Sequence, residues 1–325
     1  MNGGENNMKT RRKSLPGLVL AGLALLAACS ARAEDIDLFL RNPQTTAGRP
    51  NLLLIIDNAA KNNTSVRLLN GTKGDKLGML KEVLNLLTDP MNSTYFPACD
   101  ATKKPRVPEG CYTRKEVNDM VNNLNIGLML MNPSGSGQGG YVRSHIRPMN
   151  DLENRKLLWK SVEAGIPSAN NAEYALAMHE AYLYFGGKEA LAGFKPTGHF
   201  DAAARNSTTP SNYNSPMGDV CQPNYIIFIG NGAPASQEDK DAGPLLAGLG
   251  IALTSDPIRF TPSNLQSSWL DEYARTLHRA DVSTNLAGDQ PVTTYTIADH
   301  SPEYENDFNN NAPASARAKM QSAAL

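Results

Sequence analysis

The chain has 325 residues, with 31 lysines and arginines against 32 aspartates and glutamates, so its formal net charge is −1. A chain this close to neutral lacks the basic surface of nucleic-acid-binding proteins, and we expect no nucleic-acid partner. The length allows one large domain or two small ones, and it suffices to bury a core without additional cross-links. The composition is that of neither a fibrous nor a disordered protein.

The N-terminal segment has the layout of an export signal. A positive stretch at residues 8–13 precedes an apolar run from Leu15 to Ala28, and Ala31–Ala33 forms an A-x-A site. This order is typical of a secretory signal peptide, so we predict that residues 1–33 are removed and that the mature chain begins at Glu34. The protein is therefore expected in the periplasm, at the outer membrane or at the cell surface.

A second interpretation of the same segment stays open. Leu26, Ala27 and Ala28 before Cys29 also fit a lipoprotein processing box, which would attach a lipid to Cys29. That processing would anchor the chain to the outer membrane, whereas cleavage before Glu34 would release it.

The other cysteines suit an oxidising compartment. Cys99 and Cys111 flank a twelve-residue step that contains prolines and a glycine, so a local disulfide is the candidate pairing. Closing such a loop stabilises a fold by about 3 kcal/mol in the loop-entropy account. For Cys221 a buried position and a bridge to one of the other cysteines are both open.

The first half of the exported chain alternates apolar runs with amphipathic segments. Leu52–Ile56 is uninterrupted by polar residues and predicts a strand buried on both faces. Lys76–Thr88 has leucines at helical spacing before an Asp-Pro stop, and Asn92–Gly110 predicts a loop. Thr113–Leu124 begins with the Thr-x-x-Glu pattern of a capping box and predicts a helix. Asn125–Met131 predicts the second buried strand.

The middle of the chain continues the pattern after a glycine- and serine-rich turn at Gly135–Gly140. Tyr141–Ile146 predicts a short strand across that turn, and Glu153–Glu163 predicts a helix. Ala172–Phe185 predicts another helix, whose inward-facing residues are Ala175, Met178, Ala181, Tyr182 and Phe185.

Lys188–Pro223 is a long stretch rich in proline, asparagine, threonine and serine. Structureless stretches of that length inside a domain are uncommon and are usually functional or flexible. The remaining predicted elements are strands at Asn224–Ile229 and Val292–Ile297 and helices at Asp239–Leu249, Ser267–Ala280 and Ala312–Leu325. This alternation predicts an α/β fold, with a mostly parallel sheet and helices on both faces.

Ligands of such sheets bind at the carboxyl ends of the strands, so the polar residues that follow each strand are the first candidates. Asp57, directly after the first strand, is the best ligand for a hard cation such as Mg²⁺. The competing interpretation is an aspartate that caps the turn after the strand. The residues to inspect are Asp57, Asn58, Asn132, Pro133, Asn231, Gly232, Asp299 and His300.

Other chemical motifs are missing from the sequence. No phosphate-binding glycine loop follows a strand, and there is no G-x-S-x-G nucleophile motif. The five histidines have no metal-ligand spacing with one another or with cysteine. We therefore interpret each histidine as a surface residue or a hydrogen-bonded core residue.

Six segments together carry a resemblance to a known family. The segments are "RPNLLLIIDNAA" (49–60), "NIGLMLMN" (125–132), "GGYVRSHI" (139–146), "NAEYALAMHEAYLYFGG" (171–187), "CQPNYIIFIGNG" (221–232) and "VTTYTIAD" (292–299). Taken in order, they look like the N-terminal domain of PilY-type type IV pilus tip proteins. The resemblance implies a three-layer von Willebrand factor A-like (Rossmann-like) domain over residues 34–325, and a role in pilus assembly, surface attachment and surface sensing.

The metal site that the resemblance implies is altered in this chain. Type A domains bind a divalent cation through an Asp-x-Ser-x-Ser run, a threonine from a later loop and an aspartate after another strand. Asp57 matches the first aspartate, but Ala59 and Lys61 stand at the serine positions. Asn171 or Ala172 falls near the threonine position, and Asn231 replaces the later aspartate. We therefore expect no cofactor, with Mg²⁺ or Ca²⁺ at Asp57 as the alternative, and we hypothesise that Lys61 pairs with Asp57.

The resemblance also implies a large C-terminal β-propeller with a calcium loop in full-length relatives. This sequence ends at Leu325, in what we expect to be the last helix of the type A-like domain. A fragment, a truncated gene and a short variant are all open, and nothing about the propeller is assigned to this chain.

The functional expectation is a non-enzymatic domain of a type IV pilus tip or assembly protein. The partners that we expect are minor pilins, the pilus tip complex, or a host or abiotic surface. Binding is expected through Asp57–Ser65, Gly135–Gly140 and Lys188–Pro223. The alternatives are an exported metal-dependent hydrolase with its site at Asp57 and an outer-membrane lipoprotein scaffold anchored through Cys29.

Overall fold

The computed structural model describes part of the chain, and every described residue belongs to the unit Pro43–Leu325. The predicted signal peptide, Cys29 and the predicted helix Ala312–Leu325 lie outside the described residues. The described residues are 48–59, 65–67, 73–94, 99–100, 102, 111–133, 138–163, 165–169, 171–230, 239–249, 269–283 and 285–298.

A five-stranded sheet forms the centre of this unit, in the order β5-β4-β1-β6-β7. β1 pairs in parallel with β4 on one side and with β6 on the other, and β7 pairs in parallel with β6. Only β5 is antiparallel, to β4. The strands are β1 (Asn51–Ile56), β4 (Asn125–Met131), β5 (Gly140–Pro148), β6 (Asn224–Gly230) and β7 (Val292–Ala298).

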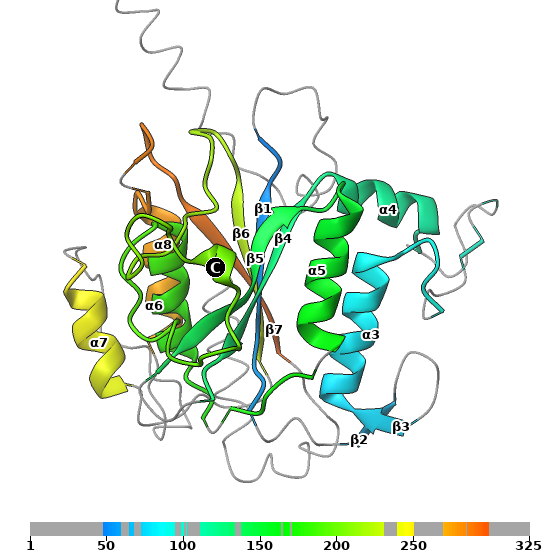
Figure 1. The fold of residues 1–325 in the computed structure, drawn as a ribbon, viewed down its shortest axis with the longest axis horizontal. Coiled ribbons are helices and arrows are strands. Elements are labelled where there is room, and N and C mark those ends of the chain that lie inside the picture. The colour runs from blue at the N-terminus through cyan, green and yellow to red at the C-terminus, as the bar shows by residue number, and fades with distance from the viewer. Residues whose placement is uncertain are drawn as a thin grey trace, which may run out of the picture. The chain divides into compact units, whose positions relative to one another are not determined.

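Helices cover both faces of the sheet (Figure 1). α3 (Lys76–Thr88), α4 (Arg114–Asn122) and α5 (Leu152–Glu163) lie on one face. α6 (Tyr174–Phe185), α7 (Asp239–Ala247) and α8 (Leu270–Arg279) lie on the other. The predicted class, an α/β fold with a mostly parallel sheet between two helical layers, is confirmed.

Most predicted elements recur within a few residues, because the patterns behind them are local. β1 is buried along its whole length, as an apolar run without polar interruption predicts. The Thr113 hydroxyl accepts a hydrogen bond from the Glu116 amide, and the Glu116 carboxylate accepts one from the Thr113 amide. This reciprocal capping box starts α4. The sequence patterns missed a two-stranded antiparallel ribbon, β2 (Ser65–Arg67) with β3 (Lys73–Asp75).

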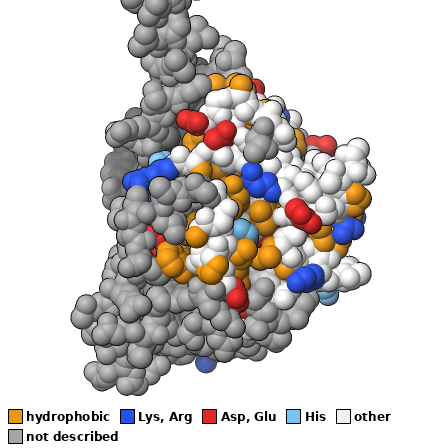
Figure 2. Space-filling view, turned by 90° about the vertical axis from the view of Figure 1, so that its left-hand side faces the viewer, with side chains coloured by type: hydrophobic (Ala, Val, Ile, Leu, Met, Phe, Trp, Pro, Cys, Tyr) orange, Lys and Arg blue, Asp and Glu red, His pale blue; other side chains and the backbone are white. Residues whose placement is uncertain are grey.

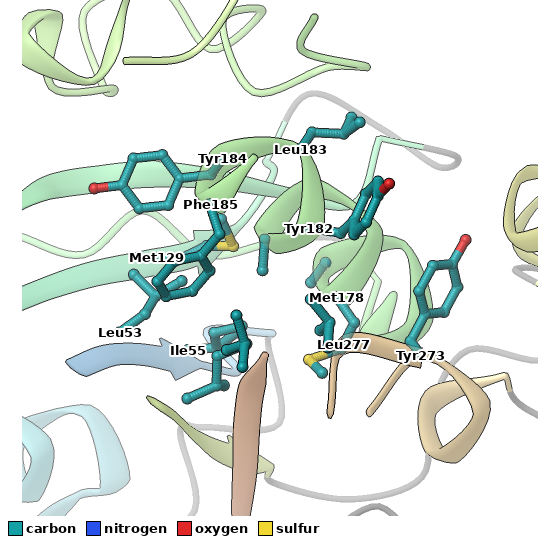
Figure 3. Packing of buried hydrophobic residues seen from close by; sticks show 14 of the residues in the cluster. Leu53, Ile55, Met129, Met178, Tyr182, Leu183, Tyr184, Phe185, Tyr273 and Leu277 are labelled. Atoms are coloured by element: carbon teal, nitrogen blue, oxygen red, sulfur yellow. The ribbon is translucent and has the colours of Figure 1, made fainter. Parts of the chain in front are cut away.

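The five residues predicted to face inward on α6 are all buried, but so are the other seven residues of the helix. One side packs on the sheet, where Phe185 meets Leu53 and Met129 (Figure 3). Met178 lies against Leu277 of α8, as the same view shows. Because α6 is buried on all sides, a third part of the chain must cover it in addition to the sheet and α8.

That cover is the long segment Lys188–Pro223, which is not the structureless loop that its composition suggested. It contains a short 3-10 turn, η2 (Ala202–Ala204), and isolated bridges that link Glu189 to Asn212 and Arg205 to Tyr213. Its side of the molecule mixes apolar side chains with charges of both signs (Figure 2). The polar groups of the segment therefore form hydrogen bonds within it, and with α6, that hold it in place.

The structure joins Cys99 to Cys111 in a disulfide. Cys221 is exposed, so the expectation of a buried cysteine is wrong, and the Cys99–Cys111 bond excludes a bridge from Cys221 to either of these partners. Disulfides of this kind are typical of proteins in oxidising compartments. Among the described residues, no helix combines the length and apolar character needed to span a bilayer.

Candidate functional site

The strand order reverses at β1, so the carboxyl ends of β1, β4 and β6 meet at the switch point of the sheet. In open α/β sheets the ligand crevice forms at this point. Asp57 follows β1, and its amide donates to the Ile229 carbonyl of β6 at 2.9 Å. Asn132 follows β4. The predicted candidates therefore lie at the expected edge of the sheet, which we call the carboxyl edge.

The Asp57 carboxylate is turned into the protein and is only 3% exposed. One oxygen, Oδ1, accepts the Ala59 amide at 2.8 Å, and the other, Oδ2, accepts the Tyr174 hydroxyl at 2.8 Å. Tyr174 is fully buried at the start of α6. The bond to Ala59 is the geometry of an aspartate that caps a turn, the competing interpretation of this residue.

Asn58 fixes the same turn from the other side and is completely buried. Its amide nitrogen donates to the carbonyls of Met131 and Pro167, at 3.2 and 2.6 Å, and its side-chain oxygen accepts the Met131 amide at 2.7 Å. Ala59 forms an isolated parallel bridge with Ala169. Asp57, Asn58 and Ala59 thus bind β1 to β4, to α6 and to the segment 165–169.

The other predicted site residues are only partly brought together. Asn171 is half-buried, three residues before Tyr174, and its side chain makes no hydrogen bond to Asp57. Lys61 and Asn231 lie outside the described residues, as do Asp299 and His300. β1 and β6 are neighbours with Ile56 opposite Ile229, as a pairing of Asp57 with Asn231 requires.

These residues do not fit a divalent cation. Both Asp57 oxygens already accept hydrogen bonds from the protein, and Ala59 offers a methyl group where an oxygen ligand is needed. Hard cations take several oxygen ligands, usually with more than one carboxylate. Within the ranges that the structure describes, no group of three histidines, cysteines or acidic residues could hold a metal ion.

A second carboxylate organises the turn between β4 and β5. Glu173 Oε2 accepts the amides of Gln138 and Gly139, at 2.8 and 3.0 Å. Gly139 has a φ of 64°, and a Cβ there would lie 2.6 Å from the Leu176 carbonyl oxygen. Only glycine fits this conformation and this close approach. The Gly-Gly pair that opens "GGYVRSHI" is therefore explained by contact with α6.

A third polar cluster fastens the long segment. Glu180 of α6 accepts hydrogen bonds from the Tyr213 hydroxyl at 2.6 Å and from the Gly193 amide at 3.0 Å. Asn132 donates from its side-chain amide to the Ala192 carbonyl at 3.1 Å. Burial raises the pKa of Glu180 to about 7, although its hydrogen bonds act in the opposite direction.

The histidines match the interpretation as core or surface residues. His145 Nδ1 lies 2.9 Å from the Tyr184 hydroxyl, and His179 Nδ1 lies 3.1 Å from the Tyr273 hydroxyl. Burial lowers the pKa of both histidines to about 4. His199 is exposed. These two contacts join β5 to α6 and α6 to α8.

Sequence reasoning missed Tyr174, Glu173 and Glu180 as parts of the site. Tyr174 lies 117 positions from Asp57, and no local pattern connects them. One signal was present: Tyr174 and Glu180 lie in a helix rich in apolar residues, and Glu173 directly precedes it. A polar residue in such a helix has to find a hydrogen-bond partner when it is buried.

Comparison with known proteins gives little. No family model matches the chain, and no curated protein matches it. Two crystal structures of the pilus adhesin SpaC from Lactobacillus rhamnosus GG, one of them in an open conformation, are weakly similar. The TM-scores are 0.32 and 0.30, at 12% and 11% identity, and each match covers 59% of this chain. The chain spans 16% of the SpaC chain. Similarity at this level establishes neither a shared fold nor a shared function.

Proposed function

We propose that the protein is an exported, non-enzymatic, von Willebrand factor A-like domain of a PilY-type protein, acting in type IV pilus assembly and surface attachment. Its partners in this proposal are minor pilins, the pilus tip complex, or a host or abiotic surface. The proposal rests on the resemblance together with one structural observation about the segments that carry it.

That observation is where the six segments lie in the structure. Each of the five strands of the sheet falls wholly or largely within one of them, and residues 171–187 contain the whole of α6. The segments that carry the resemblance thus form one contiguous unit, the sheet with its buried helix. This arrangement is the one that a resemblance to a single domain requires.

The state of Asp57 supports the non-enzymatic part of the proposal. A metal-assisted hydrolase needs open coordination positions and a base within hydrogen-bond reach of the substrate. Asp57 is 3% exposed and accepts hydrogen bonds through both oxygens. We therefore propose that the loops at the carboxyl edge act as a contact surface that does not need a cation.

The disulfide supports the proposed location outside the cytoplasm. The Cys99–Cys111 bond suits an oxidising compartment. Mass spectrometry of the mature protein distinguishes the two processing routes: an N-terminus at Glu34 supports secretion, and a diacylated Cys29 supports an outer-membrane anchor. A full-length chain retaining residues 1–33 in the cytoplasm would contradict both routes.

A deletion strain tests the function. We expect loss of the gene to reduce surface piliation or adherence, and expression of the wild-type chain to restore it. Normal piliation together with normal adherence in the deletion strain would overturn the proposal.

A binding measurement tests the cation-independent surface. Titration calorimetry of the purified chain with Mg²⁺ and with Ca²⁺ should give no tight binding. Tight binding that is lost in Asp57→Ala would show that the site is a metal centre after all.

A further inference from the structure

A buried carboxylate outside the strand-end site holds the long segment on α6. Glu180 has no exposed surface. Its Oε1 accepts the Tyr213 hydroxyl and the Gly193 amide, at 2.6 and 3.0 Å, and its Oε2 accepts the Ala192 amide at 3.3 Å. Both parts of the long segment, near residue 192 and near residue 213, therefore meet at a single side chain of the helix.

The backbone is built for this approach at Gly193. A Cβ at this position would lie 2.7 Å from Glu180 Oε1 and would overlap the Tyr213 hydroxyl. Any larger residue would push the segment away from the carboxylate. Glu180, Gly193 and Tyr213 are thus mutually dependent, and together with Ala192 we call them the Glu180 cluster.

The cluster also reaches the carboxyl edge of the sheet. While the Ala192 amide donates to Glu180, the Ala192 carbonyl accepts the side-chain amide of Asn132, the first residue after β4. The Asn132 amide in turn donates to the Gly139 carbonyl at 2.8 Å. A movement of Ala192 would therefore alter the contacts of the turn between β4 and β5.

The charge of Glu180 is not neutralised by an ion pair. Within the described residues, no lysine or arginine lies within ion-pair distance of its carboxylate. Burial without a compensating cation disfavours the ionised form, which raises the pKa of Glu180 to about 7. In the open state, with the side chain in water, the carboxyl group would return to its ordinary value of 4.5.

The titratable groups that face Glu180 do not ionise in the same range. Tyr213 comes from the long segment, and Tyr184, one turn further along α6, lies with its ring centroid 5.4 Å from that of Tyr213. Burial raises the pKa of both tyrosines. The neighbouring His179 is bonded instead to Tyr273 of α8. Near neutral pH, Glu180 is therefore the titrating group of the cluster.

We propose that the Glu180 cluster is a proton-operated latch, in which protonated Glu180 holds residues 188–223 closed on α6 and ionised Glu180 loosens them. The direction follows from linkage: the closed state binds the proton more tightly than the open state, so proton uptake favours closure. The stability of the closed state is complete below pH 4.5 and is lost as the pH rises through about 7.

Hydrogen exchange on the purified full chain tests the latch. The reporters are the amides of Ala192 and Gly193, which donate to the carboxylate. After correction for the intrinsic exchange rate, the opening equilibrium should rise about tenfold between pH 6 and pH 8 in the wild type. In Glu180→Gln, which keeps an acceptor oxygen but does not ionise, it should stay constant. A wild type without pH dependence, or a variant with the same slope, would overturn the latch.

A second measurement tests the latch even if Glu180→Gln fails to fold. The carbon-13 shift of the Glu180 carboxyl in the wild-type chain should titrate near pH 7, and a midpoint near 4.5 would overturn the proposal. In the wild type, the hydrogen bond from the Tyr213 hydroxyl favours the ionised form of Glu180. Tyr213→Phe removes that bond, so the midpoint should rise. Neither measurement depends on pili, so the latch and the proposed function can fail separately. If residues 188–223 bind a partner, as expected from the sequence, the latch would make that binding pH-dependent.

Discussion

The two ends of the central strands are both closed by polar side chains, but in different directions. At the amino end, the first residues of β4, β1 and β6 are asparagines in register. Asn125 donates to the Asn51 side-chain oxygen, and Asn51 donates to the Asn224 side-chain oxygen, each at 2.9 Å. This amide ladder (Asn125, Asn51 and Asn224) connects neighbouring strands sideways within the sheet.

At the carboxyl edge three polar side chains also reach out of the sheet. Asp57 accepts a hydrogen bond from Tyr174 of the helical layer, and Asn58 donates to Pro167 in a connecting segment. Asn132 donates to Ala192 of the long segment. Asn58 additionally joins β1 to β4 through the amide and carbonyl of Met131, so this edge fastens the cover of the sheet as well as two of its strands.

The comparison shows that a polar residue at a strand end is not by itself a sign of a ligand. The same residue type, asparagine, closes both ends, and its role depends on which partners the fold brings within reach. The amino end fixes the register of the sheet, whereas the carboxyl edge fixes loops whose positions determine a binding surface. Variants at the two ends should therefore differ in what they disturb.

The largest effect is expected at the carboxyl edge from Asn58→Ala. This change removes three hydrogen bonds, two of them buried and one part-buried, and takes the Asn58 partner from the Met131 amide and the Pro167 carbonyl. Buried polar groups left in this way cost about 3 kcal/mol of unfolding free energy. Urea unfolding measures the loss, and Asn123→Ala, at an exposed position with one local bond, should cost less than about 0.5 kcal/mol. Equal losses in the two variants would contradict the prediction.

At the amino end we expect a smaller loss, about 2 kcal/mol, from Asn51→Ala. Asn51 donates to Asn224 and to the Pro216 carbonyl, but some of its partners reach water once the side chain is gone. Hydrogen exchange separates this variant from Asn58→Ala. Protection should fall first in β4 and β6 for Asn51→Ala. For Asn58→Ala it should fall first in residues 165–169 and at the Met131 amide, which loses its acceptor, while β6 keeps its protection. The same exchange pattern in both variants would remove the distinction between the two ends.

Sequence patterns predicted the strands well, because a buried parallel strand is a local apolar run. They also placed Asp57 at the correct edge, since the rule about strand ends needs only the strand and the residue after it. The amide ladder was missed although its signal is visible: "NLLLII", "NIGLMLM" and "NYIIFI" each begin with asparagine before an apolar run. The repeat was missed because only the residues that follow each strand were considered as candidates.

The partners of the site residues could not be predicted in the same way. Tyr174 meets Asp57, and Tyr213 meets Glu180, only because the helix and the long segment fold back on the sheet. The burial of the remaining residues of α6 could not be predicted for the same reason, since the segment that covers the outer side of the helix has the composition of a loop. Contacts between distant segments leave no periodic signal in the sequence.

A third variant, Tyr174→Phe, tests how strongly the carboxyl edge is tied to α6. It removes the hydroxyl that donates to Asp57 Oδ2 and keeps the ring, which packs edge-on against Phe228. We expect a loss of about 1 kcal/mol in urea unfolding. Titration with Mg²⁺ adds a second readout, because removal of the hydroxyl leaves Asp57 Oδ2 without that donor. A stability equal to that of the wild type would show that the bond contributes nothing.

The smallest effect near neutral pH comes from neither end but from two histidines, His145 of β5 and His179 of α6. The pKa of His145 and that of His179 are lowered to about 4, mainly by burial, from an unfolded value of 6.5. Their neutral forms stabilise the fold fully above pH 6.5, and this stability is lost as the pH falls toward 4. Between pH 7.5 and 6.5 we expect a loss of less than about 1 kcal/mol.

Glu180 opposes this trend, because its raised pKa adds stability as the pH falls. The measurement therefore belongs in the Glu180→Gln background, where urea unfolding at pH 7.5, 6.5 and 5.5 isolates the histidines. Adding His179→Asn, which retains a polar group near the Tyr273 hydroxyl, should flatten the pH dependence. The cost of Asn51→Ala should be the same at all three pH values, because amides do not titrate. A cost that changed with pH would show that the amide ladder is coupled to the histidines and is not an independent closure of the amino end.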